Sequence, residues 1–451
     1  VWTVVKSAFG VTNEKALGEK LIELAAKCEG DAALAAGYEP ERYAVKTFDA
    51  LEEQLRGVAV SLRPLAPSPI DRVRGEVPFA ITGDGRLRVL DESSVGRSVG
   101  DKVKDIAAWL TTRRADALVV SKLDEIAWLT NLRGSEASYA TTFRAEAVAT
   151  RDAVLLCVHA APVTDELRAR CPGVRFVAHD ELFSALKEAA SKGRKPRVAL
   201  DPASVSVATR DAFAALPAEV LALESPIVKA KAKKNPTELA AMKRAFAKAD
   251  SVVAEAQRWL LGEVSNGARV SETDFARKVE SLFLAAGAVG LSFKVISAFG
   301  LNGASVHHPP SDSTLIEAGQ LMLLDTGCYF EEGYATDLTR TFFVGGAGDA
   351  PTTEQQRLYT MTLRSAIAGM TARVAKGAVG AQLDGITRAP LWAEGLDYAH
   401  GTGHGVGINV HESPPGVTKM STLGIEEGHV FSIEPGLYVE GVGGGRIENL
   451  C

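Results

Sequence analysis

Residues 321–344 read LMLLDTGCYFEEGYATDLTRTFFV, and their pattern indicates how the C-terminal half of the chain folds. An apolar run that ends in Asp325 and a second run that follows Asp337 flank the turn signal Glu331-Glu332-Gly333. Apolar runs on both sides of a short glycine-containing turn are typical of an antiparallel hairpin. Folding the chain at this turn places Asp325 and Asp337 opposite each other, within about one residue of register.

The two aspartates lie on a mostly apolar hairpin, where an ionised carboxylate is costly to bury. Facing each other, Asp325 and Asp337 repel and lose hydration, so they need a cation, a shared proton or a basic partner. The pair alone leaves a second interpretation open, in which one aspartate points to solvent or pairs with Arg340.

Three further side chains have a similar setting. Glu434 and Glu448 each end or interrupt a short apolar segment, and His404 lies in the glycine-rich run GTGHGVG. Singly, each of these residues fits an ordinary edge or loop position. Together, two aspartates, two glutamates and one histidine form an oxygen-rich donor set, which favours a dinuclear site for Mn²⁺, Co²⁺ or Zn²⁺ over a thiolate structural site. Such a site predicts metal-assisted hydrolysis.

Histidines gather in the same third of the chain. Six of the eight lie between His307 and His429. Two metal ions that already have five ligands do not need three more histidines, namely His307, His400 and His411. Imidazoles beside a metal can act as proton shuttles or oxyanion donors. For each of the three, an ordinary hydrogen-bonded loop position stays open. We interpret His308 and His429 as structural.

The composition is that of a soluble globular protein. The chain has 451 residues, 46% hydrophobic and 24% charged, and its net charge of -6 argues against a nucleic-acid partner. No apolar run approaches the roughly 18 residues of a spanning helix, so we expect no membrane partner. The five cysteines lack metal or redox spacing and favour the reducing cytoplasm. The chain opens with Val1 and has no basic leader, so we expect a piece of a longer protein without a signal peptide.

Upstream of the acidic residues, helical and strand-like patterns alternate, which is typical of α/β domains. The expected helices are 14–28, 47–56, 101–114 and 123–131, the last ended by Gly134, and the expected strands are 117–120, two within 145–159, and 197–200. The lysine-rich run 229–234 admits a phosphate site, but we interpret it as a solvated linker. Asn235 then caps a long helix. From about residue 290, short strands and one helix, 354–374, predict antiparallel α+β structure.

Several short motifs together make a specific resemblance. DTGCY (325–329), TDLTRT (336–341), HGTGHGVG (400–407), EPGLY (434–438) and RIEN (446–449) resemble the pita-bread metallopeptidase family, which includes aminopeptidase P, prolidase and methionine aminopeptidase. Upstream, LDEIAWLTNLRGS (123–135) and GLDY (395–398) resemble the three-domain, cytosolic-type aminopeptidase P, or Xaa-Pro aminopeptidase. The implied fold is α+β, with an incomplete first N-terminal α/β domain (1–78), a second, creatinase-like α/β domain (79–228) and a pita-bread catalytic domain (229–451).

The same resemblance implies a ligand set for two divalent metal ions, Mn²⁺ above Zn²⁺ or Co²⁺. Asp325 would chelate one ion, His404 and Glu434 the other, while Asp337 and Glu448 would bridge both. A bridging hydroxide would attack the carbonyl of the first residue of an Xaa-Pro peptide, and Glu434 would help to manage the proton. The resemblance further implies peptide substrates with proline in second position, a homodimer and a cytoplasmic location.

Further residues match the family's substrate and proton-transfer positions. His411 would contact the substrate and steady the tetrahedral oxyanion, and His400 matches a proton shuttle. His307 matches the substrate-binding histidine, with His308 as the alternative register. Arg446 belongs to the same set of residues, and its implied role is to hold a carboxylate.

Two other functions share these motifs. A prolidase would keep every metal ligand but cleave only dipeptides, and the extra N-terminal region argues against it. A metal-free homologue that only binds peptides would replace at least one ligand, and all five are present. The chain departs from the family at Trp2-Thr3, which the expected Asp-Gly-Arg does not follow, so no substrate arginine is assigned there. His404 and His411 are seven residues apart, a spacing typical of bacterial-type members of the family. The continuation that usually follows Glu448 is missing from this sequence.

Overall fold

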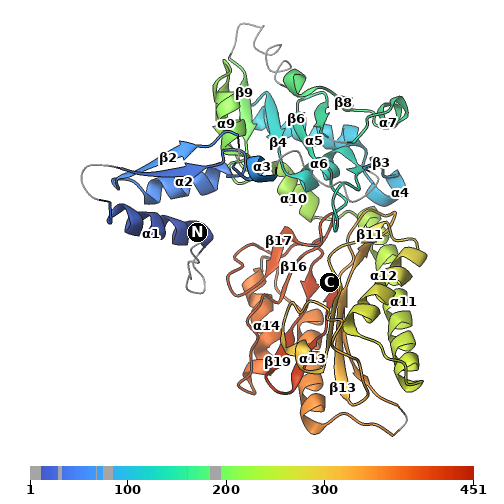
Figure 1. Ribbon diagram of the computed structural model, residues 1–451. Helices are drawn as coiled ribbons and strands as arrows, with labels where there is room; N and C mark the ends of the chain where they lie inside the picture. Colours follow the sequence, from blue (N-terminus) through green and yellow to red (C-terminus); the bar gives the residue numbers. More distant parts are fainter. Residues whose placement is uncertain are drawn as a thin grey trace.

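The computed structural model describes residues 12–28, 33–67, 69–74, 85–159, 161–182, 195–346 and 348–451. Figure 1 shows three successive parts: a small N-terminal segment, a middle sheet with helices around it, and a C-terminal part with its own strands and helices. Trp2 and Thr3, where the sequence departs from the family, lie outside the described residues. Within those residues, none of the helices is both long and apolar enough to span a membrane.

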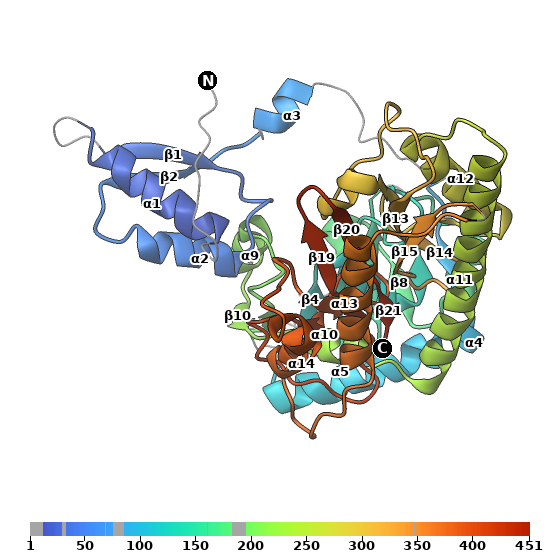
Figure 2. The same cartoon turned by 90° about the horizontal axis from the view of Figure 1, so that it is seen from below.

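The N-terminal segment is a two-stranded parallel sheet with helices beside it. Its elements are α1 (Asn13–Ala25), β1 (Leu34–Tyr38), α2 (Val45–Gln54) and β2 (Val60–Pro64), followed by the short helix α3 (Pro69–Arg74). The two helices expected here are confirmed, with ends shifted by a few residues. Several backbone hydrogen bonds attach the segment to the middle part, among them the one from the N–H of Val45 to the carbonyl of Val205 at 2.9 Å. Figure 2 shows the segment projecting from the rest of the molecule.

The middle part is a six-stranded mixed sheet in the order β10-β9-β4-β6-β7-β8, and its alternating elements confirm the predicted α/β class. The elements are β3 (Arg88–Val89), α4 (Glu92–Val95), α5 (Val99–Arg113), β4 (Ala117–Val120), α6 (Leu123–Thr130), β5 (Leu132–Arg133), β6 (Ala145–Ala149), β7 (Val154–Val158), α7 (Asp165–Arg170), β8 (Val174–Phe176), β9 (Arg197–Leu200), α9 (Val207–Ala214) and β10 (Glu219–Ala222). Gly134 does not end α6 as predicted. The helix already stops at Asn131, whose φ of 57° is left-handed, a conformation that asparagine tolerates.

Helices α10 (Pro226–Ala232) and α11 (Pro236–Ser265) connect the middle part to the C-terminal part. The predicted cap of the long helix is confirmed. The side chain of Asn235 accepts the backbone N–H groups of Thr237 and Glu238, and the Glu238 carboxylate accepts the N–H of Asn235 in return. The helix start is therefore fixed by a reciprocal capping box.

The interpretation of 229–234 as a solvated linker is wrong for two of its lysines. Lys229 and Lys233 are exposed, as expected, but Lys231 and Lys234 are buried. The ammonium groups of both buried lysines lie beside the carboxylate of Glu412, at 2.7 Å and 3.4 Å. A run of four lysines in sequence gives no sign of a distant acid, so the burial of two of them was not predictable from that run.

The C-terminal part packs antiparallel strands between two pairs of helices (Figure 1), which confirms the predicted α+β class. Helices α11 and α12 (Glu272–Ala285) lie on one side, and α13 (Thr353–Met370) and α14 (Gly380–Trp392) on the other. The strands and the short 3-10 turn η1 are β11 (Gly290–Leu291), β12 (Ile296–Phe299), η1 (Gly300–Ala304), β13 (Gln320–Thr326), β14 (Cys328–Tyr329), β15 (Leu338–Val344), β16 (Gly403–Gly405), β17 (Glu412–Val417), β18 (Ser432–Ile433), β19 (Gly436–Val439), β20 (Gly443–Arg446) and β21 (Asn449–Leu450).

Two expectations for this part need correction. We predicted one helix here, 354–374, and did not predict α14, because Gly380, Gly385 and Pro390 are residue types that disfavour a helix. The hairpin register also differs from the prediction, since Asp325 pairs with Thr339 and not with Asp337. Side chains two residues apart on a strand share a face, so Asp337 still lies on the face of Asp325.

Candidate metal centre

The five predicted ligands converge in one cavity of about 540 Å³. Asp325 ends the apolar part of β13, and Asp337 comes directly before β15. His404 is the central residue of β16. Glu434 lies between β18 and β19, and Glu448 between β20 and β21. Short strands that are far apart in sequence therefore deliver one donor residue each to the same place.

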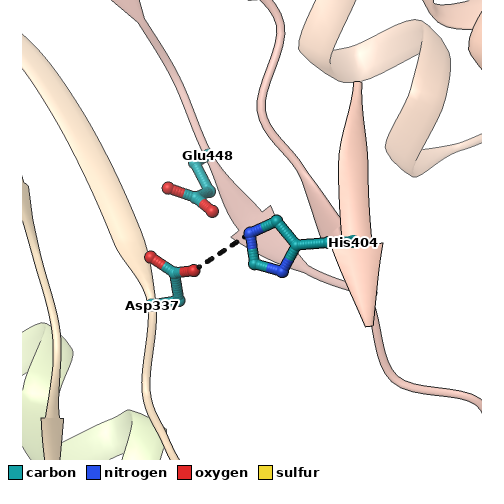
Figure 3. Close-up of side chains that lie close together, drawn as sticks. All are labelled: Asp337, His404 and Glu448. Atoms are coloured by element: carbon teal, nitrogen blue, oxygen red, sulfur yellow. Dashed lines mark ion pairs between the residues drawn. The ribbon is translucent and has the colours of Figure 1, made fainter. Parts of the chain in front are cut away.

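The donor atoms are close enough to share a metal ion. One donor atom from each of Asp337, His404 and Glu448 lies within 4.8 Å of the other two, and Figure 3 shows both carboxylates beside the imidazole ring. The Nε2 atom of His404 is 3.5 Å from Asp337 Oδ2 and 3.3 Å from Glu434 Oε1. Asp325 is buried on the same face and completes the set.

Two carboxylate oxygens in this set have no hydrogen-bond partner among the described residues. They are Oδ1 of Asp325 and Oε1 of Glu448, and both atoms are buried. A buried acceptor without a partner costs free energy, and a cation in the cavity would satisfy both atoms. The donor set, four oxygen-donating carboxylates and one imidazole, fits two divalent ions of the Mn²⁺, Co²⁺ or Zn²⁺ type.

The other oxygens of the ligands are held by neutral or cationic donors. Arg446 Nη2 donates to Asp325 Oδ2 at 2.7 Å, and Thr339 Oγ1 donates to Glu448 Oε2 at 2.7 Å. Ser432 Oγ donates to Glu434 Oε1 at 3.1 Å. These bonds restrict the rotation of the Asp325, Glu434 and Glu448 carboxylates.

The electrostatics of the cluster call for positive charge. Burial and then the neighbouring carboxylates raise the pKa of Asp337 and of Glu448 well above their ordinary values. The pKa of Asp325 is raised as well, chiefly by burial. Burial also acts to raise the pKa of Glu434, but the hydrogen bond and charge of His404 outweigh it and hold that pKa low. A cation in the cavity would favour the ionised form of all four acids.

His400 lies at the edge of the cluster, joined to Arg446 through a tyrosine. Its Nδ1 donates to the carbonyl of Gly401 at 2.7 Å, and its Nε2 is 2.9 Å from Tyr438 Oη. Tyr438 Oη in turn accepts from Arg446 Nη1 at 2.8 Å. Burial lowers the pKa of His400, so the ring is neutral near pH 7 and can exchange a proton at Nε2. Tyr438 was not among the predicted site residues, and its place in the EPGLY motif was the one available signal.

The remaining predicted histidines lie at the same cavity. The His411 ring centroid is 4.1 Å from that of His404, and burial together with His404 lowers the pKa of His411. His307 is an exposed residue of the cavity wall. His308 also lines the cavity, but its Nε2 is 2.8 Å from the fully buried Glu272 carboxylate of α12. The ring of His308 is thus already held by a protein acid.

The family models match most of the chain in two blocks. Residues 240–451 match the model of metallopeptidase family M24, and residues 82–238 match the creatinase/prolidase N-terminal domain. The probable Xaa-Pro aminopeptidase P of Sordaria macrospora is 36% identical over 379 residues, which cover 80% of this chain and 61% of that relative. The chain spans about three fifths of the length of the curated relatives it matches.

Two solved structures place the fold. An X-prolyl aminopeptidase from Caenorhabditis elegans, described as a cytosolic enzyme with a di-nuclear active site, has a TM-score of 0.86 and 27% identity, covering 99% of this chain and 71% of that chain. An Xaa-Pro dipeptidase from Bacillus anthracis has a TM-score of 0.65 and 23% identity, covering 78% of this chain and 94% of that chain. The predicted pita-bread architecture behind a creatinase-like α/β domain is confirmed.

Proposed function

We propose that the protein is an Xaa-Pro aminopeptidase, which releases the first residue from peptides with proline in second position, because residues 240–451 match the model of metallopeptidase family M24. The observation that carries the proposal is the convergence in one cavity of five side chains of metal-ligating type, two of which have unpartnered buried oxygens. The relatives named Xaa-Pro aminopeptidase, at 35–36% identity, support the substrate class.

We infer that the centre takes two divalent ions, and we propose Mn²⁺ as the physiological metal. Asp325 would hold one ion, His404 and Glu434 the other, with Asp337 and Glu448 between them. When bound, such ions supply a water of lowered pKa and polarise the carbonyl of the scissile bond. Zn²⁺ and Co²⁺ suit the same donors and would compete for the site.

The protein groups around the cavity would then orient substrate and move protons. The ionised carboxylate of Glu434 would take the proton of the attacking water. A neutral His411 still carries one ring N–H, which can donate to the oxygen of the tetrahedral intermediate. His400 can carry a proton at Nε2 towards the leaving proline nitrogen, with Tyr438 Oη at 2.9 Å as its relay.

Substrate recognition would fall to the exposed side of the cavity. We propose that His307, which lines the cavity and is exposed, contacts the peptide. Arg446 is 2% exposed and is bonded to Asp325 and Tyr438, so it acts on the reaction by holding these two residues. We further propose a homodimer in the cytoplasm, and the five free cysteines fit a reducing compartment.

The second candidate function is a prolidase, which cleaves Xaa-Pro dipeptides. Solved dipeptidases share the fold with this chain at 23–25% identity. The experiment that separates the two uses metal-stripped protein reloaded with Mn²⁺ and incubated with Arg-Pro-Pro, Xaa-Pro dipeptides and a peptide without proline. The proposal expects release of the first residue from Arg-Pro-Pro. Cleavage of dipeptides alone would make the protein a prolidase, and no cleavage by metal-loaded protein would point to a peptide-binding homologue.

A further inference from the structure

Four charged side chains, three of them buried and one largely buried, meet where the linker contacts both the middle and the C-terminal parts. We call Asp124, Lys231, Lys234 and Glu412 the linker cluster. Lys231 Nζ is 2.9 Å from Asp124 Oδ2 and 2.7 Å from Glu412 Oε2, and Lys234 Nζ is 3.4 Å from the same Glu412 oxygen. Their side chains are at most 15% exposed, and that of Glu412 is fully buried.

Burying this many charges is costly, and a hydrophobic set would stabilise the fold at least as well. The cluster is neutral in sum, with two lysines and two acids, which limits the cost. Burial acts to raise the pKa of Glu412, but the two lysines outweigh it and bring that pKa to about 2. A charged cluster kept inside the protein at this expense is best explained by the position it imposes on its neighbours.

The neighbour of the cluster is the loop that carries His411. Residues 405–412 run from β16 to β17 and curl around the Glu412 carboxylate, whose Oε1 accepts the backbone N–H of Asn409 at 3.1 Å. A Cβ atom on Gly407 would lie 2.5 Å from Glu412 Oε2, so the loop closes directly on the carboxylate. His411 comes directly before Glu412 in the chain, and its ring packs on that of His404, a proposed metal ligand.

The cluster also spans the two parts of the molecule. Asp124 belongs to α6 of the middle part, Lys231 to the linker helix α10, and Glu412 to β17 of the C-terminal part. A shift of the middle part would move Lys231 and, through Glu412, the loop beside the catalytic cavity.

We propose that Lys231, Lys234 and Glu412 are positioning residues that hold His411 over the metal centre and couple its placement to the middle part through Asp124. The proposal rests on the role of His411 in the proposed function. It assigns no contact with substrate to the cluster. The buried lysines act only through the loop that ends at His411.

The chain offers matched control lysines on the same linker. Lys229 lies two residues before Lys231 in α10, is exposed, and pairs at 3.3 Å with Glu224. Lys233 is half-exposed and pairs with Glu426 on the surface. Lys229→Gln and Lys233→Gln remove the same charge from the same segment without touching Glu412, so we expect less than a twofold change in kcat/KM for either.

The decisive experiment is a double-mutant cycle with Mn²⁺-loaded protein and Arg-Pro-Pro. We expect Lys231→Gln to lower kcat at least tenfold in the wild-type background, with little change in KM, because an oxyanion donor acts in the transition state. In the His411→Ala background the same substitution should cost less than a further twofold, since its target is gone. An equal loss in both backgrounds, or no loss in the wild type, overturns the proposal.

Lys231→Gln leaves Glu412 short of a partner, so a milder variant accompanies it. Asp124→Asn keeps both lysines on Glu412, and we expect a loss of at least threefold that disappears in the His411→Ala background. If Lys231→Gln does not fold, this cycle decides, and equal losses in both backgrounds overturn the proposal.

A structural readout separates this proposal from the proposed function. The ¹⁵N-histidine NMR signal of His411, assigned by its absence in His411→Ala, should shift in Asp124→Asn and Lys231→Gln but not in Lys229→Gln. That result would support the positioning role even if no peptide is cleaved, and an unmoved signal would overturn it. A protein with no activity on any Xaa-Pro peptide would overturn the proposed function alone.

Discussion

Arg446 links the candidate metal centre to His400 through two hydrogen bonds of one guanidinium group. Its Nη2 donates to Asp325 Oδ2 at 2.7 Å, and its Nη1 donates at 2.8 Å to Tyr438 Oη, which lies 2.9 Å from His400 Nε2. The planar fork of arginine makes both bonds at once, which a lysine ammonium on a flexible stem does not reproduce. The alignment of Asp325 and of His400 thus depends on one buried side chain.

Arg446→Lys should therefore weaken the metal centre while keeping the charge. We expect Mn²⁺ affinity to fall about 10- to 100-fold, because the substitution disturbs a group that orients a ligand. Isothermal titration of metal-stripped protein measures this. Arg364→Lys on the exposed side of α13 is the matched control and should leave affinity unchanged. An Arg446→Lys protein with wild-type affinity would show that Asp325 needs no such support.

Asp337→Ala and Glu434→Ala should each abolish turnover, by more than about a thousandfold, and leave the protein folded. Asp337 is repelled by Glu448, Asp325 and Glu434, so its removal relieves repulsion in the metal-free protein. The thermal midpoint without metal should stay constant or rise. Asp312→Ala, which removes an exposed acid, is the control. Full activity in either variant would refute the proposed mechanism.

Metal binding should stabilise the wild type and fail to stabilise Asp337→Ala. A ligand that binds only the folded state, at a concentration one hundred times its Kd, raises the free energy of unfolding by about 2.7 kcal/mol. Differential scanning calorimetry with and without Mn²⁺, followed by chelator, measures the shift in midpoint. Equal shifts in the wild type and Asp337→Ala would mean that the metal binds elsewhere.

Glu125 gives a pH-dependent prediction far from the metal centre. Burial raises its pKa from 4.5 to about 7, while Ser225 Oγ donates to it at 2.6 Å. The folded state therefore keeps a proton that the unfolded state loses between pH 4.5 and 7, so this group lowers the stability progressively across that window. Glu125→Gln should match the wild type near pH 4.5 and exceed it by up to about 3 kcal/mol above pH 7.

Denaturant unfolding at several pH values measures the difference between the two proteins. Glu166→Gln changes an exposed glutamate in the same part of the chain and should give no pH-dependent difference. A constant difference between wild type and Glu125→Gln from pH 4.5 to 8 would mean that Glu125 stays ionised when buried.

The candidate site was largely predictable because its ligands mark the sequence strongly. An acid at the end of an apolar strand, such as Asp325, is unfavourable for folding alone, and such positions often have a functional role. The hairpin register could not be predicted to within one residue, because the sequence does not show how many residues the turn between β14 and β15 contains. Lys231 is buried beside Glu412, which lies far along the chain. Local sequence patterns do not show which distant residues come into contact.

A Mn²⁺ titration of metal-stripped protein, with bound metal and arginine released from Arg-Pro-Pro measured in the same samples, tests whether the metal centre performs the cleavage. We expect no release without metal, two ions bound per chain at saturation, and free arginine and Pro-Pro as products. Release of arginine by metal-free protein, or intact Arg-Pro-Pro at metal saturation, would show that the metal centre does not perform this reaction.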